Sequence, residues 1–191
     1  MPTRFTTSGY LPGRMLIAMP GMTDPRFSRT VVYICAHTAE GAMGIVVNRE
    51  IDTLSFTDLL EQLNIEPTTR CQPIRIRFGG PVEAGRGFVL HTPDYLQDTT
   101  MLVSEQVALT ATIDVLKAMA EGRGPRRSML ALGYAGWGAG QLDSEILENA
   151  WLVSPADDDL IYDANMDVKW EQAIHKMGIN LSTLSGAAGH A

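Results

Sequence analysis

The hydrophobic pattern of the chain predicts short buried strands separated by turns. Residues 30–36 and 42–47 are β-branched, aromatic and apolar, which is typical of two buried strands. The segment between them, residues 37–41, is short and ends in a glycine, so we expect a hairpin. Residues 74–78 alternate apolar and arginine side chains, as a half-exposed strand does. Further short strands are predicted at residues 87–91, 101–103, 129–132, 151–153 and 160–162.

Helical periodicity marks four other segments. In residues 55–63 the apolar positions share one face, and Ser55 with Asp58 has the spacing of a capping box. Residues 105–121 carry a longer apolar stripe, which Ser104 could cap and Gly122 could end in the left-handed conformation. Two more helices are predicted around residues 141–149 and over residues 167–177, the last ended by Gly178.

The order of these elements predicts an α+β fold with a mostly antiparallel sheet. The early strands follow one another without intervening helices, so a purely parallel, doubly wound sheet does not fit. No linker divides the chain, and we expect residues 1–180 to form a single domain. The small, polar tail, residues 181–191, is expected to be disordered.

Composition and charge exclude several classes of protein. Hydrophobic residues make up 45% and charged residues 19% of the chain, so intrinsic disorder and coiled coil fit poorly. The net charge of −7 argues against a nucleic-acid or anionic-membrane surface for the molecule as a whole. Residues 1–141 are nevertheless neutral, with 13 basic and 13 acidic side chains, and 12 of the basic ones are arginines. Because arginine binds carboxylate and phosphate bidentately, residues 1–141 could still form an anion-binding patch.

The cysteines and the apolar runs predict a cytoplasmic protein with reduced thiols. Cys35 and Cys71 are too few for a disulfide framework, and neither belongs to a C-x-x-C pair. The apolar run from Met15 to Met19 is too short for a membrane span and lacks the layout of a signal peptide. We therefore expect no membrane association.

The glycine-rich segment 133–140 is the most conspicuous candidate for ligand chemistry. It lies between a predicted strand and a predicted helix, an arrangement that can bind phosphate through free backbone N–H groups. It matches neither G-x-G-x-x-G nor the P-loop, and Asp143 and Glu145 at the start of the helix would repel a phosphate. The alternative is a tight loop whose glycines let Tyr134 and Trp137 pack or face a groove.

Metal chemistry has little support. Cys35 and His37 could form two corners of a zinc site, but the remaining candidates follow no ligand spacing. These candidates are His91, His175 and Cys71. The acidic residues 157–159 are interpreted as a solvated turn, because the glycine and glutamate of a calcium loop are missing. Neither a metal nor a cofactor is expected.

Two groups of arginines could bind an anion if the fold brought them together. By default, such residues lie on solvated faces. The first group is Arg70, Arg75 and Arg77, and the second group is Arg123, Arg126 and Arg127.

A series of motifs along the chain resembles the YqgE/AlgH family of bacterial proteins. Their order and spacing match from about residue 8 to residue 178. Ala36 departs from the pattern, because many members carry an acidic residue between the cysteine and the histidine. The motifs are Leu16-Ile-Ala-Met-Pro20, Asp24-Pro-Arg-Phe27, Tyr33-Ile-Cys-x-His37, Gly41-Ala-Met-Gly-Ile-Val-Val-Asn48, Gly79-Gly-Pro-Val82, Arg86-Gly-Phe-Val-Leu-His91, Leu132-Gly-Tyr-Ala-Gly-Trp-Gly-Ala-Gly-Gln-Leu142 and Glu145 with Asn149-x-Trp151-Leu152.

The resemblance implies an α+β fold with a partly closed β-barrel and flanking helices. It implies little about activity, because the family is largely uncharacterised. One branch is named as a transcriptional regulator of alginate synthesis, yet the present sequence has no helix-turn-helix with a basic recognition helix, so it argues against direct DNA binding.

Our leading hypothesis is a ligand- or partner-binding protein with a regulatory role. Its partner, a small molecule or a protein, and its oligomeric state are left open. If the hypothesis holds, the polar residues that the motifs place at strand ends and loops should converge on one concave surface. They are Asp24, His37, Asn48, Arg86, His91, Tyr134, Trp137 and Gln141.

An enzyme acting on a small phosphorylated or nucleotide-like ligand is the alternative. His37 or His91 would serve as general acid or base, Arg86 as an anion clamp, and the glycine-rich loop as a backbone donor. Direct transcriptional regulation is a weaker third hypothesis.

Overall fold

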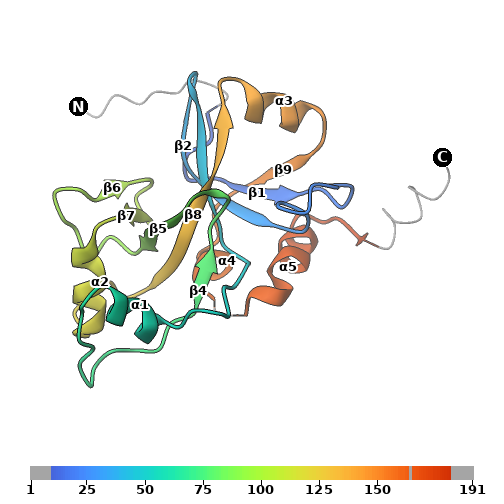
Figure 1. Ribbon diagram of the computed structural model, residues 1–191. Helices are drawn as coiled ribbons and strands as arrows, with labels where there is room; N and C mark the ends of the chain where they lie inside the picture. The colour runs from blue at the N-terminus through green and yellow to red at the C-terminus, as the bar shows by residue number, and fades with distance from the viewer. Residues whose placement is uncertain (1–9, 164, 182–191) are drawn as a thin grey trace.

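A half-barrel of antiparallel strands forms the centre of the molecule (Figure 1). The computed structural model describes residues 10–163 and 165–181. Along the sheet the strand order is β6-β7-β5-β8-β3-β2-β1-β9, with β4 paired to β8. The strands are β1 (Met15–Ala18), β2 (Val31–Thr38), β3 (Gly41–Val46), β4 (Ile76–Phe78), β5 (Val82–His91), β6 (Met101–Leu102), β7 (Ala108–Thr110), β8 (Ser128–Gly138) and β9 (Trp151–Ser154).

The long strand β8 joins the two halves of the sheet. Its first part pairs antiparallel with β5 and parallel with β4, whereas its last residues pair antiparallel with β3. Figure 1 shows β8 running diagonally through the sheet, from the side of α1 and α2 toward α3. The predicted α+β class, with a mostly antiparallel, partly closed barrel and flanking helices, is confirmed.

The helices cover three separate apolar surfaces of the sheet. The helices are α1 (Phe56–Gln62), α2 (Ile113–Ala120), α3 (Gln141–Leu147), α4 (Asp158–Tyr162) and α5 (Lys169–Lys176), with a 3-10 turn at Met166–Val168. Helices α4 and α5 close the largest cluster, within the half-barrel. Helix α3 covers the outer face of β1, β2 and β3, and α1 with α2 covers β4, β5 and β8. None of the helices in the described residues is long and apolar enough to cross a membrane.

Local sequence signals with a clear physical basis are confirmed. Strands β2 and β3 form the predicted hairpin. Ser55 and Asp58 make the reciprocal capping-box hydrogen bonds at the start of α1. Gly122 and Gly178 follow α2 and α5 with φ of 72° and 77°, the left-handed geometry that lets glycine end a helix.

Three expectations about the elements are wrong, and one strand was not predicted. The apolar stripe of residues 105–121 belongs to two elements: β7 occupies residues 108–110, and α2 begins only after Thr112. Ser104 accordingly accepts the backbone N–H groups of Gln106 and Val107 in a turn. Residues 160–162 lie in α4, where Asp157 caps a short helix whose apolar residues are all buried. Residues 15–18, which no pattern singled out as a strand, form β1.

The third wrong expectation concerns the glycine-rich segment, which is strand and not loop. Residues 133–138 continue β8, so their backbone groups face β3 and β5 in the sheet. Glycine is needed here because Gly80 passes directly over the strand: a Cβ at Gly80 would lie 2.0 Å from the carbonyl carbon of Tyr134, and one at Gly133 would lie 2.3 Å from the oxygen of Gly80. The tail expected to be disordered falls, from residue 182 onward, outside the described residues.

Candidate functional site

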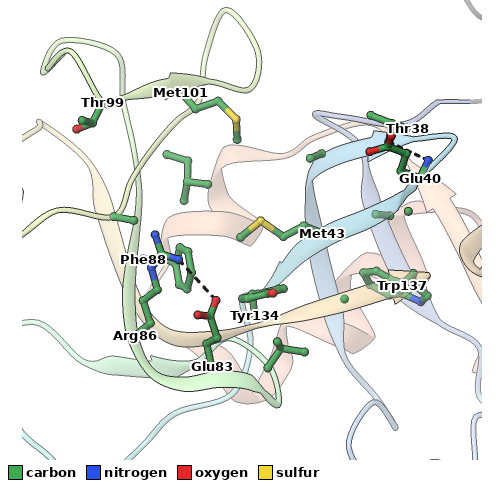
Figure 2. Close-up of a pocket in the computed structure, with 17 residues that line it drawn as sticks. Thr38, Glu40, Met43, Glu83, Arg86, Phe88, Thr99, Met101, Tyr134 and Trp137 are labelled. Carbon is green, nitrogen blue, oxygen red and sulfur yellow. Dashed lines mark hydrogen bonds and ion pairs between the residues drawn. The ribbon is translucent and has the colours of Figure 1, made fainter. Parts of the chain in front are cut away.

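The half-barrel opens into a cleft of about 670 Å³. Met43 of β3, Phe88 of β5 and Tyr134 of β8 form an apolar floor that continues into the main core (Figure 2). The rings of Phe88 and Tyr134 meet edge to face, with centroids 5.7 Å apart. Met101 of β6 and the β2–β3 hairpin stand on opposite sides of the floor in Figure 2. The cleft is thus large and apolar enough for the body of a small ligand.

Arg86 is the cationic group of the cleft. It lies where the pairing of β5 with β8 is interrupted, between Val82 and Gly87. Its guanidinium is 5.2 Å from the ring centroid of Phe88 and 3.6 Å from the carboxylate of Glu83. Because both side chains of this ion pair are more than half exposed, the pair is weak and leaves the guanidinium accessible to an anion. The other polar lining residues are Thr38, Glu40 and Thr99.

Three of the eight candidate site residues line this cleft: Arg86, Tyr134 and Trp137. Trp137 contributes only an edge, since the residue is 6% exposed and packs mainly in the cluster beneath α3. The structure does not bring the other five to the cleft. They are Asp24, His37, Asn48, His91 and Gln141.

Asp24 and Asn48 stabilise the loop between β1 and β2. The carboxylate of Asp24 accepts hydrogen bonds from the backbone and guanidinium of Arg26, which lower the pKa of Asp24. The side chain of Asn48 accepts from the N–H of Val31 and donates to the carbonyl of Arg29, each at 2.9 Å. Their contacts in the structure are therefore local.

His91 is buried at the end of β5. Its Nδ1 lies 2.9 Å from the carbonyl of Thr92, and its Nε2 lies 2.7 Å from Oγ1 of Thr110. Burial lowers the pKa of His91, which favours a neutral ring that donates from Nδ1 and accepts at Nε2. Both ring nitrogens are thus used within the fold.

His37 and Cys35 lie on opposite faces of β2. The pairing of β2 with β3 shifts register between Ile34 and Ala36, so the i, i+2 spacing does not place both on one face. Cys35 packs in the main core, where burial raises the pKa of its thiol to about 12. Nδ1 of His37 accepts the N–H of Leu11, and its Nε2 is 3.7 Å from Asp143 of α3. Among the described residues, no three His, Cys, Asp or Glu side chains form a metal-binding group.

Comparison with known proteins places the chain in a family. A family model described as AlgH-like matches residues 15–182. The chain belongs to the AlgH-like family. It is 56% identical to a UPF0301 protein of Rhodospirillum rubrum, and the match covers 100% of both chains. It is also 50% identical to a UPF0301 protein of Methylobacterium nodulans, over 100% of this chain and 95% of the relative.

Two solved structures share the fold. The solution structure of the AlgH protein from Pseudomonas aeruginosa is 45% identical, with a TM-score of 0.78 over 97% of this chain and 98% of that one. The crystal structure of protein DIP2367 from Corynebacterium diphtheriae is 20% identical, with a TM-score of 0.70 over 86% of each chain. These findings confirm the resemblance to the YqgE/AlgH family.

Several AlgH-like motif residues build an aromatic cluster under α3. Glu145 accepts the indole N–H of Trp137 at 3.2 Å and that of Trp151 at 3.0 Å, and its second oxygen accepts the amide of Gln141 at 2.9 Å. Phe27 lies against both indoles, at 6.3 and 5.9 Å between ring centroids. Glu145 thus binds two tryptophans, a role that the sequence analysis did not assign to it.

The expectation that Arg77 belongs to a half-exposed basic strip is wrong, because its side chain is buried. Its guanidinium donates to four backbone carbonyls, including that of Val47 at 2.9 Å. The ammonium of Lys169, at the start of α5, lies 3.3 Å from the carbonyls of Val47 and Ile161. Arg77 and Lys169 therefore stabilise the contact of α4 and α5 with the half-barrel. The other carbonyls that Arg77 contacts are those of Ile161, Tyr162 and Asp163.

The apolar residues of the cleft were not predicted as site residues. Met43 and Phe88 lie inside motifs already recognised, but an apolar residue in a predicted strand is ordinarily a core residue. Met101 belongs to a two-residue strand whose position depends on its partner β7. Only the folded sheet shows that these side chains border an opening.

Proposed function

We propose that this AlgH-like protein is a binding protein for a small amphipathic anion, with the cleft as its site and a regulatory role for the binding event. The apolar part of the ligand would rest on Met43, Phe88 and Tyr134. The anionic group would bind the guanidinium of Arg86 at the rim.

The observation that carries this proposal is the combination of an apolar floor with one accessible cation. Methionine side chains are flexible and polarisable, so Met43 and Met101 can adjust to the shape of a ligand. Arg86 is oriented by its stacking on Phe88 and is only weakly paired with Glu83. A ligand that lacked either an apolar body or an anionic group would use only half of the site.

A fluorescence titration with 1-anilinonaphthalene-8-sulfonate tests the proposal, because this probe combines aromatic rings with one sulfonate. We expect saturable binding of one probe per chain. Arg86→Gln should weaken it about fivefold, the value of one partly exposed charged contact. Met101→Glu should weaken it further, because Met101 is 40% exposed and the new carboxylate would repel the sulfonate.

Arg75→Gln is the matched control, since Arg75 is exposed, lies outside the cleft and pairs with Glu50. Probe binding that Arg86→Gln and Met101→Glu leave unchanged, in variants that unfold like the parent protein, contradicts the proposal.

The enzymatic alternative receives no support from the arrangement of the described residues. His37 and His91 do not line the cleft, and the glycine-rich segment that was to donate backbone N–H groups is part of the sheet.

A further inference from the structure

Arginines from two distant loops meet around a second cavity, of about 390 Å³. Arg70 comes from the segment between α1 and β4, and Arg126 and Arg127 come from the segment before β8. This cavity lies near the start of β8, whereas the cleft lies near its end. None of the other residues that line this cavity is acidic.

The loop that carries Arg70 is fixed to the end of α2. Thr68 donates its backbone N–H and its hydroxyl to the carbonyl of Ala120, both at 3.0 Å. The backbone N–H of Arg70 then donates to the Thr68 hydroxyl at 3.2 Å. Gly122 packs so closely that a Cβ there would lie 2.6 Å from Cβ of Arg70. The backbone that positions this arginine is therefore held in place.

The second loop is fixed by the turn after β5. The backbone N–H of Arg126 donates to Asp94 at 2.9 Å, and that of Arg127 donates to the hydroxyl of Thr92 at 3.2 Å. Thr92 in turn donates its own N–H to the carbonyl of Arg127 at 3.0 Å. Asp94 thus binds the backbone of Arg126, and the charge of Arg126 also helps to lower the pKa of Asp94.

The guanidinium groups have few close negative partners, although Arg126 also borders a neighbouring cavity that Asp94, Glu105 and Asp158 line. Within the described residues, the side chains of Arg70 and Arg126 make neither a hydrogen bond nor a salt bridge. Arg127 lies 5.1 Å from the ring centroid of Tyr162 and 3.4 Å from Asp159, whose side chain is 77% exposed. That pair is a weak surface pair which an incoming anion can displace. In a chain of net charge −7, a cavity lined by three arginines and no carboxylate is a local concentration of positive charge.

We propose that this arginine pocket is a binding site for a small organic phosphate, separate from the cleft. Guanidinium groups bind phosphate oxygens bidentately, and three of them match a group that carries two negative charges. Phe56, Ile74 and Met119 give the cavity an apolar wall for the organic part. The pre-set loops reduce the entropy that binding would otherwise cost.

Isothermal titration with AMP, pyrophosphate and citrate tests the assignment. We expect saturable binding of one AMP per chain, weaker binding of pyrophosphate, which cannot use the apolar wall, and little binding of citrate. Arg70→Gln and Arg126→Gln should each weaken AMP binding at least tenfold, because each removes a charged contact to the phosphate. The control is Arg75→Gln, on the surface and outside both cavities, which should bind AMP like the parent protein.

Each contrary result overturns the proposal in its own way. Absence of AMP and pyrophosphate binding at millimolar concentration removes the site. Citrate binding as strong as AMP binding would show that the pocket does not select phosphates and would change the assigned ligand class to polycarboxylates. A loss of affinity that is equal for Arg75→Gln and Arg70→Gln indicates non-specific attraction. Arg70 lies outside the cleft and Arg86 lies outside the pocket. The effect of Arg70→Gln on AMP binding and the effect of Arg86→Gln on binding of the sulfonate probe are therefore measured separately, so failure here and failure of the proposed function are distinguishable.

Discussion

At the scale of single residues, the buried pair of cations Arg77 and Lys169 is the least conventional feature. Both side chains contact backbone carbonyls; the negative charge of Asp163 acts on both of them, and that of Glu50 acts on Arg77. The pKa of Lys169 is lowered to about 7, mainly by burial and secondly by the positive charge of Arg77. Burial also lowers the pKa of Arg77 to about 10.

The pKa of Lys169 predicts a pH-dependent stability. The ordinary lysine pKa is 10.5, so between about pH 7 and 10.5 the unfolded chain holds a proton that the folded chain has released. The penalty of burying the ammonium is complete below pH 7 and disappears as the pH rises toward 10.5. We expect Lys169→Met to raise the free energy of unfolding at pH 6.5 by about 2 kcal/mol, and to reduce its increase between pH 7 and 10. Urea unfolding across this range measures both effects.

Lys117→Met is the control for that experiment, because Lys117 is exposed on α2. A parent protein whose stability is flat between pH 7 and 10, or changes there in the same way as that of Lys169→Met, would contradict the assignment.

Glu145 gives a second prediction at this scale. Replacing it by alanine leaves two largely buried indole N–H groups without an acceptor, so we expect a loss of about 2–3 kcal/mol in the free energy of unfolding. Glu145→Gln keeps an acceptor oxygen and should lose less. Glu148→Ala, at an exposed position at the end of the same helix, should change little. Equal losses in Glu145→Ala and Glu148→Ala would exclude the proposed role.

At the scale of elements, the close crossing of Gly80 over β8 limits what the strand can tolerate. Gly80 has φ of 153° and no room for a Cβ, because the backbone of Tyr134 and Ala135 lies within 2.3 Å of that position. We expect Gly80→Ala to lower the free energy of unfolding by more than about 3 kcal/mol, or to prevent folding. Gly85→Ala meets nothing within 4 Å and should unfold almost like the parent protein. Thermal unfolding of the two variants compares them directly, and similar midpoints would contradict the steric argument.

The elements also show which parts of the fold depend only on residues that are close together in the sequence. The hairpin, the capping box of α1 and the glycines after α2 and α5 depend on neighbours within a few residues, and they were predicted. The division of residues 105–121 was not, because β7 exists only through its pairing with β5 and β6. The glycine-rich strand was not predicted for the same reason. Glycine is required at position 133 by the close contact with Gly80, which lies 53 residues earlier in the chain.

At the scale of the whole molecule, the excess acidity of the C-terminal part is partly matched by basic residues from elsewhere. Glu171 pairs with Arg29, and Asp159 pairs with Arg127. These contacts link α5 and α4 to segments far away in the sequence.

The candidate site was only partly accessible to prediction. Polar motif residues could be named from the sequence, but the structure brings only Arg86, Tyr134 and Trp137 of them to the cleft. The arginine groups were noted, but not that Arg70 would meet Arg126 and Arg127 while Arg77 turned inward. Convergence of this kind is decided by tertiary pairing rather than by spacing along the chain.

The late position of β8 and β9 in the chain has a consequence for synthesis. Strands β3, β4 and β5 obtain their central partner only after residue 138 has left the ribosome, and β1 pairs with β9 only after residue 154. Until then the apolar edges of these strands lack their final neighbours, and non-local pairing of this kind is slow. Much of the nascent chain must therefore wait with its edges exposed, and the half-barrel can close only near the end of translation.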